Sequence, residues 1–470
     1  MATNILLTTD SYKVTHHLQY PPGTELVYSY FESRGGKFSE TVFFGLQYIL
    51  KKHLVGVVVT REKIEEAAAV MDAHLGPGLF NKKGWEYILE KHGGRLPLRI
   101  RAVPEGTIVP NKNVLFTVEN TDPNCFWLSN YVEGLLVQVW YPLTVCTNSR
   151  EQKKIIAKYL SETADSLDGL PFKLHDFGFR GSTSVESAAV GGASHLVNFR
   201  GSDTIPALIM AKDYYGQEEV AGVSIPAAEH STITAWTQSG EVDAFRNMLI
   251  QFKDGAVACV SDSYNIWEAC EKLWGGELKD LVMGRGQRGV GPLVIRPDSG
   301  DPATVVVKVL DTLGGKFGTT LNSKGYKMLP DYLRVIQGDG ISYESLSAIM
   351  EHMKANQWSI DNLTFGSGGA LLQRLHRDTQ KCAYKCSYAI INGKGVDIFK
   401  DPVTDHGKLS KKGKLSLELD EGGKLVTRTQ GTGDPHKDVM VTVFENGELL
   451  KDYSFKEVRA RAEIPQLKST

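Results

Sequence analysis

Polar residues follow a series of short apolar segments in the middle of the chain, between residues 170 and 395. Guanidinium groups bind phosphates and carboxylates accept hydrogen bonds from sugar hydroxyls, so the set as a whole is typical of a site for an anionic, hydroxyl-rich ligand. Taken singly, each residue is more typical of a helix cap or a turn. The residues are His175, Asp176, Phe177, Arg180, Arg200, Asp203, Glu229, His230, Asp262, Arg296, Asp298 and Asp339.

The most specific local pattern is a glycine-rich turn after Phe365. Residues 366–369 read Gly-Ser-Gly-Gly and lead into an apolar helical pattern. Small residues let backbone N–H groups close on a phosphate at the positive end of a helix. We therefore predict a phosphate site at Gly368 and Gly369, to which Arg377 adds a bidentate contact. A plain tight turn is the alternative.

Arg296 and Asp298 place a guanidinium and a carboxylate two residues apart. In an extended chain, residues i and i+2 point to the same side. Arg296 is therefore predicted to hold an anion while Asp298 accepts hydrogen bonds from ribose hydroxyls. Asp339 stands between two glycines and offers a second carboxylate for the same diol. A structural salt bridge is the alternative for either segment.

His230 lies at a predicted turn from strand to helix. Histidine titrates near neutrality, so His230 could act as a base, a phosphate ligand or a phosphoryl acceptor, or it could be purely structural. Asp262 could fix the tautomer of the ring through a hydrogen bond, as carboxylates behind functional histidines do.

Other motifs fail in their context. The GxGxxG pattern of residues 284–289 precedes a predicted strand rather than a helix, so it is not a dinucleotide fingerprint. The chain has no GxxxxGK[ST], HExxH or CxxC pattern, and no metal held directly by protein ligands is expected. Asn362 opens a glycosylation sequon, but it stands in a predicted buried strand.

Composition narrows the class of protein. The chain of 470 residues has 53 Lys plus Arg against 55 Asp plus Glu, a formal charge of −2, which argues against nucleic acid or an anionic membrane as its main partner. Six cysteines are too few for a disulfide scaffold, and the N-terminus lacks the regions of a signal peptide. No uncharged apolar stretch of about 18 residues occurs. We expect a soluble, cytoplasmic protein.

The elements that must position the polar residues alternate between strand and helix. Such alternation implies parallel βαβ units, and seven or eight in one block predict a closed or nearly closed α/β barrel. An open doubly wound sheet is the alternative. The carboxyl ends of barrel strands meet at one rim, which would bring the polar residues together. The expected strands are residues 172–175, 195–199, 222–226, 256–260, 292–296, 333–337, 362–365 and 387–391.

Several segments also resemble a known family. In chain order they are TTDSYKVTHHLQYPPGTELVYSYFESR, LHDFGFRG, VNFRGSDT, PAAEHSTITAW, SDSYNIWEACEKLW, IRPDSGDP, IQGDG, FGSGGALLQ and KCSYAIINGKGVDIFKDPVTD. From Asp10 to the end, the chain is similar to the nicotinamide phosphoribosyltransferases, which are type II phosphoribosyltransferases.

The resemblance implies a (β/α) barrel-like domain of residues 151–395 and an α+β domain formed by both chain ends, residues 1–150 and 396–470. It implies a homodimer with two active sites at the subunit interface. The implied reaction joins nicotinamide to 5-phosphoribosyl 1-pyrophosphate, giving nicotinamide mononucleotide and pyrophosphate in NAD salvage, with Mg²⁺. ATP hydrolysis is implied to assist through a phosphohistidine at His230, with Asp262 orienting the ring.

The resemblance also implies roles for single residues. Phe177 and Tyr12 of the partner subunit would stack on the pyridine ring, and Asp203 would accept the carboxamide N–H. Arg296 would hold the amide oxygen or the pyrophosphate. Asp298, Gly338 and Asp339 would bind the ribose hydroxyls. The phosphate groups would be bound by Arg180, His230, Gly368, Gly369, Arg377, Lys385, Lys408 and Arg34 of the partner subunit.

Three alternatives differ in their chemistry. A nicotinate phosphoribosyltransferase is the nearest, and Asp203 discriminates against it because a carboxylate repels nicotinate and accepts an amide N–H. A non-catalytic binding module would be expected to lack some motif residues, and all of them are present. A sugar-phosphate aldolase or isomerase would usually need a lysine or a metal cluster at the rim, and the sequence offers neither.

Overall fold

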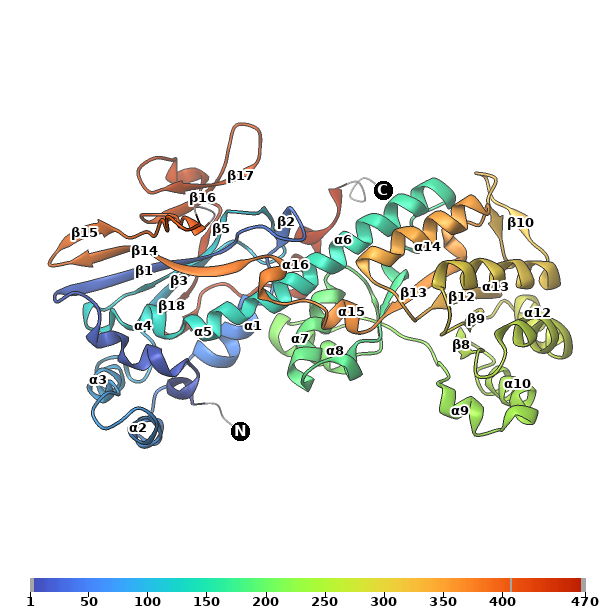
Figure 1. Ribbon diagram of the computed structural model, residues 1–470, viewed down its shortest axis with the longest axis horizontal. Coiled ribbons are helices and arrows are strands. Elements are labelled where there is room, and N and C mark those ends of the chain that lie inside the picture. Colours follow the sequence, from blue (N-terminus) through green and yellow to red (C-terminus); the bar gives the residue numbers. More distant parts are fainter. Residues whose placement is uncertain (1–3, 406–407, 466–470) are drawn as a thin grey trace. The chain divides into compact units, whose positions relative to one another are not determined.

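The computed structural model describes residues 4–405 and 408–465, and the chain divides into two compact units (Figure 1). Unit 1 consists of Met1–Thr147, Asp213–Gln217 and His376–Glu463. Unit 2 consists of Asn148–Lys212, Glu218–Leu375 and Ile464–Thr470. The second boundary thus falls after Leu375 and not at the expected residue 395.

Unit 1 is built on an antiparallel sheet of seven strands in the order β15-β14-β1-β5-β3-β18-β19. Its longest strands, β1 (Thr24–Ser33) and β14 (Cys382–Ile391), come from opposite ends of the chain and pair directly (Figure 1). Both chain ends therefore share one sheet. The other strands are β15 (Lys394–Asp397), β5 (Val114–Asn120), β3 (Leu98–Ala102), β18 (Val441–Glu445) and β19 (Glu448–Leu449).

The longer helices of unit 1 begin at residues that cap them. The Thr60 side chain accepts the backbone N–H of Lys63 at the start of α2 (Arg61–His74), and Asn81 caps α3 (Lys82–His92) in the same way. The shorter elements are α1 (Leu46–Ile49), α4 (Leu128–Tyr131), α5 (Glu133–Leu136), α16 (Phe455–Ala462) and the paired strands β2 (Glu40–Val42) with β4 (Ile108–Pro110) and β16 (Leu415–Leu419) with β17 (Leu425–Thr429).

Unit 2 is a parallel α/β barrel. Six strands pair in the order β7-β6-β13-β12-β9-β8, all of them parallel. The segment 223–227 joins the two edge strands, because Val223 bridges Gly201 of β7 and Ala227 bridges Ala258 of β8. The circuit closes through this irregular member, which confirms the predicted barrel-like domain. The strands are β6 (Leu174–Asp176), β7 (Gly201–Ser202), β8 (Val257–Val260), β9 (Leu293–Arg296), β12 (Leu333–Gln337) and β13 (Leu363–Ser367).

Alternate residues of the barrel strands face two different cores. Ile295 of β9 belongs to the large core that the helices cover, whereas Val294 packs with Ala258 and Ile336 in a small separate cluster beside Phe177. This small cluster lies inside the barrel and contains few side chains. It therefore leaves space at the end of the barrel where the polar residues stand.

The helices of unit 2 follow the strands. Asp301 caps α13 (Pro302–Phe317) through the N–H of Thr304, and proline occupies the first position. The others are α7 (Val185–Leu196), α9 (His230–Thr234), α10 (Glu241–Gln251), α11 (Ile266–Glu268), α12 (Lys279–Arg288), α14 (Tyr343–Ala355) and α15 (Gly369–Leu372), with the strand pair β10 (Thr320–Leu321) and β11 (Lys327–Met328). Two helices, α6 (Trp140–Thr163) and α8 (Ile205–Tyr215), contain residues of both units. Within residues 4–405 and 408–465, no helix is long and apolar enough to span a bilayer.

Three of the expected barrel strands differ from the structure. Residues 222–226 form no regular strand and contain only the isolated bridge of Val223. Residues 195–199 include the end of α7, a helix capped by Ser184 and buried along most of its length, so their apolar run belongs to a buried helix. Residues 387–391 belong to β14 of unit 1. Exposure along β14 switches repeatedly between buried and half-buried residues, which is typical of an antiparallel strand rather than of a fully buried barrel strand.

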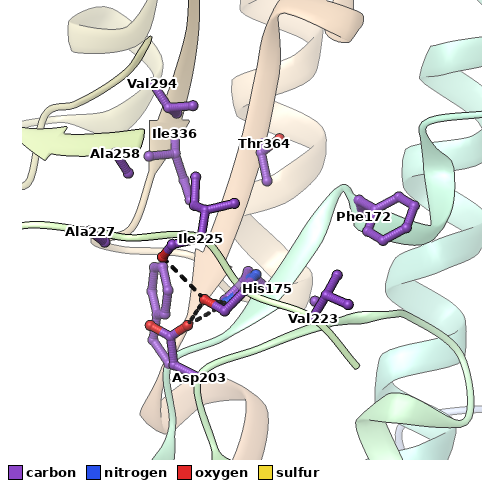
Figure 2. Close-up of a pocket in the computed structure, with 13 residues that line it drawn as sticks. Phe172, His175, Asp203, Val223, Ile225, Ala227, Ala258, Val294, Ile336 and Thr364 are labelled. Carbon is purple, nitrogen blue, oxygen red and sulfur yellow. Dashed lines mark hydrogen bonds and ion pairs between the residues drawn. The ribbon is translucent and has the colours of Figure 1, made fainter. Parts of the chain in front are cut away.

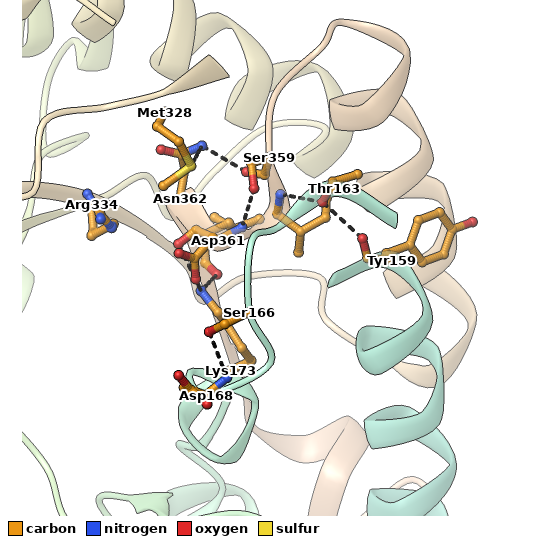
Figure 3. Close-up of polar contacts among 12 residues, drawn as sticks. Tyr159, Thr163, Ser166, Asp168, Lys173, Met328, Arg334, Ser359, Asp361 and Asn362 are labelled. Atoms are coloured by element: carbon orange, nitrogen blue, oxygen red, sulfur yellow. Dashed lines mark hydrogen bonds and ion pairs between the residues drawn. The ribbon is translucent and has the colours of Figure 1, made fainter. Parts of the chain in front are cut away.

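The Asn362 sequon is structural, because the Asn362 side chain is completely buried. Its Nδ2 donates to the carbonyl oxygen of Ser359 at 2.8 Å (Figure 3). Nδ2 also donates to the carbonyl oxygen of Lys327 at 2.9 Å, and Oδ1 accepts the backbone N–H of Leu329 at 2.8 Å. The side chain thus ties together three turns of the chain beside β13.

Replacing Asn362 with alanine is expected to lower the free energy of unfolding by about 2–4 kcal/mol, because buried backbone groups lose their partners. Urea denaturation would measure the change. Asn356→Ala is the matched control, since Asn356 is exposed and donates to the carbonyl of His352 near the end of α14. A loss of stability in Asn362→Ala no larger than in the control would contradict the structural role.

Candidate active site

A cavity of about 720 Å³ in unit 2 collects most of the residues that the sequence singled out. It lies where the barrel strands end and their loops begin. The predicted residues in its lining are Phe177, Arg180, Asp203, His230, Arg296, Asp298, Gly338, Asp339, Gly368 and Gly369. They come from the ends of several different strands, as a site on a barrel rim requires.

Phe177 provides the aromatic face of the cavity; Gly366 makes room for it, and Gly338 lies at ordinary contact distance. A Cβ at Gly366 would stand 2.0 Å from Cε2 of the ring, and a Cβ at Gly338 would stand 3.5 Å from the same atom. The backbone N–H of Phe177 donates to the carbonyl of Ser367 at 2.9 Å. The ring is therefore held against the backbone of β13, and a side chain at residue 366 would displace it.

Arg296 and Asp298 lie on the same side, as their spacing predicted, and they form the ion pair that was given as the structural alternative. Nη2 of Arg296 lies 2.9 Å from Oδ2 of Asp298, and Nε lies 3.3 Å from Oδ1. The guanidinium carbon is 5.8 Å from the centroid of the Phe177 ring. The pair puts a positive and a negative group beside the aromatic face, where an anion and a hydroxyl-bearing group could bind side by side.

His230 and Asp262 also meet as predicted. Nε2 of His230 lies 3.0 Å from Oδ1 of Asp262, while Nδ1 lies 4.0 Å from Oδ2 of Asp298. Oδ2 of Asp262 accepts the backbone N–H of Asp298 at 3.0 Å and the hydroxyl of Ser299 at 2.5 Å. Burial raises the pKa of Asp262, but the hydrogen bonds from Ser299, His230 and the Asp298 N–H outweigh it, so the pKa is lower than usual. Asp262 is therefore an anion that orients the imidazole.

Asp203 is held by two neighbours that come from other strands. Its Oδ1 lies 2.7 Å from Nε2 of His175 on β6 and accepts the hydroxyl of Ser224 from the segment that closes the barrel (Figure 2). Burial raises the pKa of Asp203, but the contacts with His175 and Ser224 and the charge of Arg296 bring it below its usual value. The group therefore faces the cavity as a carboxylate.

The phosphate-binding candidates lie at another part of the lining. Arg180 follows β6 in a short turn, and a Cβ at the adjacent Gly181 would lie 3.6 Å from Cα of Gly369. The cavity lining at Gly368 and Gly369 is therefore backbone only, next to a guanidinium side chain. Among the described residues, the one group with metal-ligand spacing is His92, Asp122 and Cys125, which belongs to unit 1 and not to this cavity.

A second, mainly apolar pocket of about 190 Å³ shares part of this lining (Figure 2). Phe177 and Asp203 belong to both. Inside the barrel the second pocket is lined by Phe172, Val223, Ile225, Ala258, Val294, Ile336 and Thr364. A flat ring placed at Phe177 therefore meets an apolar wall on the barrel side and polar groups on the rim side.

Five further predicted residues belong to unit 1: Tyr12, Arg34, Arg377, Lys385 and Lys408. Tyr12 is 60% exposed. Burial lowers the pKa of Lys385, and the positive charges of Arg34, Lys400 and Arg377 lower it further, so these cations lie near one another. Lys408 instead pairs with Asp405 at 3.5 Å.

Sequence reasoning missed the residues that support the predicted ones. His175 was noted only as a polar residue after a strand, and Ser224, Ser299 and Lys400 were not singled out. Serine is common in turns and helix caps, so neither its type nor its position signals the role of Ser224. Only the closure of the barrel brings it to Asp203.

A parallel barrel with an aromatic face, an arginine–carboxylate pair and a glycine turn at one rim is typical of enzymes that act on phosphorylated sugars. Comparison with known proteins narrows the class. The model of the nicotinate phosphoribosyltransferase (NAPRTase) family matches residues 172–448, and that of the nicotinamide phosphoribosyltransferase N-terminal domain matches residues 4–100. The chain belongs to this nicotinate and nicotinamide phosphoribosyltransferase family.

Several relatives carry the name nicotinamide phosphoribosyltransferase, and two of them match nearly the whole chain. That of Xanthomonas campestris pv. campestris is 50% identical over 472 residues, 99% of each chain. That of Acinetobacter baylyi is 33% identical over 492 residues, 97% of each chain. Among solved structures, human nicotinic acid phosphoribosyltransferase matches with a TM-score of 0.62 at 15% identity, over 98% of this chain and 93% of that one. Nicotinate-nucleotide pyrophosphorylase from Pyrococcus furiosus matches with a TM-score of 0.60 at 14% identity, over 98% of this chain and 95% of that one. These two structures support the fold.

Proposed function

We propose that this protein transfers the 5-phosphoribosyl group of phosphoribosyl pyrophosphate to nicotinamide, giving nicotinamide mononucleotide and pyrophosphate in NAD salvage. The observation that carries the choice of nicotinamide is Asp203, a carboxylate held at the edge of the Phe177 face. A carboxylate accepts the N–H of a carboxamide and repels the carboxylate of nicotinate. The name shared by the two relatives supports the same choice.

The proposed reaction is a displacement at C1 of the ribose. The pyridine nitrogen forms a bond to C1 as the bond from C1 to the pyrophosphate oxygen breaks, and the positive charge passes to the pyridinium ring. No general base is needed because the pyridine nitrogen carries no proton. Asp298 and Asp339 stabilise the positive charge that develops on the ribose, while Arg180 and Arg296 stabilise the leaving pyrophosphate. Phe177 holds the ring in line for the attack.

The cavity fits a magnesium ion that arrives with the substrate. Mg²⁺ prefers oxygen ligands, keeps several waters and is commonly held through substrate phosphates. The carboxylates and the open phosphate turn of the cavity suit such a complex, without a direct protein ligand. When bound, Mg²⁺ would neutralise charge on the leaving pyrophosphate.

For ATP, we propose that His230 accepts the γ-phosphoryl group. With the Nε2 proton directed to Asp262, the lone pair of Nδ1 is free to attack phosphorus, and ADP leaves as the bond to its oxygen breaks. Water later attacks the phosphohistidine and releases inorganic phosphate. Hydrolysis at this position, beside Asp298, would couple ATP to the binding of phosphoribosyl pyrophosphate.

We also propose a homodimer that acts in the cytoplasm. Ile205 and Ile209 of α8 are 67% and 52% exposed, which favours a covered apolar face. The cations around Lys385 and the exposed Tyr12 would then serve the site of the other subunit. All six cysteines carry free thiols, as in reducing compartments.

Product analysis tests the proposed reaction. The purified protein is incubated with phosphoribosyl pyrophosphate, Mg²⁺ and an equal mixture of nicotinamide and nicotinate, with and without ATP. Nicotinamide mononucleotide as the main product is expected. Nicotinate mononucleotide as the main product would overturn the substrate, and the absence of both would overturn the activity.

His230→Ala is expected to abolish the stimulation by ATP and to leave slow basal synthesis, because the phosphoryl acceptor is lost while Phe177 and Asp203 remain. Initial rates with and without ATP, and acid-labile ³²P on the protein, would measure this. His352→Ala is the matched control, a histidine on the exposed side of α14. Full stimulation by ATP in His230→Ala would exclude the phosphohistidine.

A further inference from the structure

The Asp203 carboxylate is engaged on one side only. Oδ1 receives both hydrogen bonds, one from His175 and one from Ser224. Among the residues that the structure describes, no hydrogen bond or ion pair is found for Oδ2. Since Asp203 lines the cavity and its side chain is 46% exposed, the second oxygen remains for a ligand.

His175 is fixed where it meets Asp203. Its side chain is only 14% exposed, and a Cβ on residue 201 would lie 2.6 Å from its Nδ1, so the ring packs directly on the backbone of Gly201. Gly201 lies on β7, two residues before Asp203. β7 pairs with β6, and Gly201 is the residue that pairs with His175. The imidazole and the carboxylate are thus positioned by the same pair of strands.

The charged surroundings of His175 are few. Asp203 follows β7, and the positive charge of Arg296 at the end of β9 lowers the pKa of Asp203. Asp176 on the same strand is buried and accepts the N–H of Gly178 at 2.7 Å. The closing segment contributes the uncharged Ser224, and β13 contributes Gly366, whose backbone pairs with His175. The charge next to Asp203 on this side is therefore set by the protonation of His175.

We propose that His175 and Ser224 are positioning residues that hold Asp203 as a one-sided, ionised acceptor, and that His175 makes the choice between nicotinamide and nicotinate depend on pH. The inference rests on the proposed function, in which Asp203 recognises the carboxamide. Neutral His175 donates Nε2–H and leaves the pair with a negative charge. Protonated His175 neutralises that charge.

The direction of the pH effect follows from these charges. Carboxyl groups ionise at about pH 4, so the carboxylate of nicotinate stays charged, and only the protein changes, over the range in which histidine side chains ordinarily titrate. At high pH the negative pair repels nicotinate and accepts the amide N–H. At low pH the neutral pair repels nicotinate less and is a weaker acceptor for the amide. The preference for nicotinamide should therefore fall as the pH falls.

The test measures kcat/KM for both substrates from about pH 5.5 to 8.5 with the full-length protein, a range that spans the titration of histidine. In the wild type, the ratio of the two values is expected to fall about tenfold or more toward low pH. His175→Gln retains an N–H donor but has no titrating ring, so its ratio should stay high and independent of pH. His175→Phe lacks the donor, and its ratio should be about tenfold lower at high pH, through a higher KM for nicotinamide rather than a lower kcat.

A wild-type ratio that does not change with pH, or a His175→Gln ratio that changes as the wild type does, would overturn the inference. These two measurements decide it even if His175→Phe does not fold. The variant Asp203→Asn distinguishes a failure of the inference about His175 from a failure of the proposed function. If Asp203→Asn keeps the full preference for nicotinamide, Asp203 does not recognise the carboxamide at all. If Asp203→Asn loses the preference while the wild-type ratio is independent of pH, the inference alone fails.

Discussion

Asp298→Ala is expected to lower kcat for nicotinamide mononucleotide synthesis by about a thousandfold. This is the upper end of the kcat losses observed when one group that stabilises transition-state charge is removed. Asp298 is paired with Arg296 through two contacts, at 2.9 Å and 3.3 Å. The substitution removes the carboxylate that would stabilise the cationic ribose, and it also leaves the Arg296 guanidinium unpaired beside that cation. Both effects act in the transition state, so kcat should fall far more than KM rises.

Steady-state kinetics with Asp298→Asn and Asp331→Ala complete this experiment. The amide of Asp298→Asn keeps a hydrogen-bond acceptor but lacks the charge, so its loss should be smaller than that of alanine. Asp331 is a fully exposed carboxylate of unit 2 that pairs with Arg334, and its removal should leave kcat unchanged. A loss below about tenfold in Asp298→Ala would show that the carboxylate does not stabilise the transition state.

Gly366→Ala is expected to raise KM for nicotinamide by about ten- to a hundredfold, because a lost aromatic contact of this size costs about 1.5–3 kcal/mol. The added Cβ would stand 2.0 Å from Cε2 of Phe177, and a rigid ring cannot give way as a flexible side chain does. The Phe177 ring must therefore move away from the backbone of β13. KM for phosphoribosyl pyrophosphate should change little, since the glycines of the phosphate turn are untouched.

Two further variants keep the Gly366 prediction testable. A Cβ at Gly255 meets no atom within 4 Å, so Gly255→Ala is the matched control and should bind nicotinamide normally. The double variant Gly366→Ala with Phe177→Ala has room for the Cβ and should be no worse than Phe177→Ala alone. Additive losses in the double variant would mean that Gly366 acts on the site by another route.

The predicted fold followed from the chain because the hydrophobic pattern of the barrel strands is strong. A short, fully apolar segment such as that of β8 is typical of a strand buried on both faces. The error at residues 195–199 has a physical origin in the same rule, because a helix buried on all sides has the same composition as a buried strand. The error at residues 387–391 came from the chain order, which placed a strand of unit 1 directly after the barrel.

Some contacts of the candidate site could be predicted from the sequence more directly than others. Arg296 ends β9 and Asp298 follows it by two residues, so their placement on the same side follows from local geometry. The contact between His230 and Asp262 spans 32 residues, and it was expected from the shared rim of the strand ends and from the family resemblance rather than from a local pattern. Which carboxylate would meet which histidine could not be read from spacing alone.

The sequence by itself determined the alternation of strands and helices, the polar residues that follow the strands, and the glycines that allow close packing beside them. The tertiary structure alone decided which side chains meet. Asp203 lies 28 residues from His175 and 21 residues from Ser224 along the chain, and no local pattern relates them. His175 meets Asp203 because β6 pairs with β7, and Ser224 meets Asp203 because the irregular segment 223–227 closes the barrel next to β7. Closure is a property of the whole sheet rather than of any one strand.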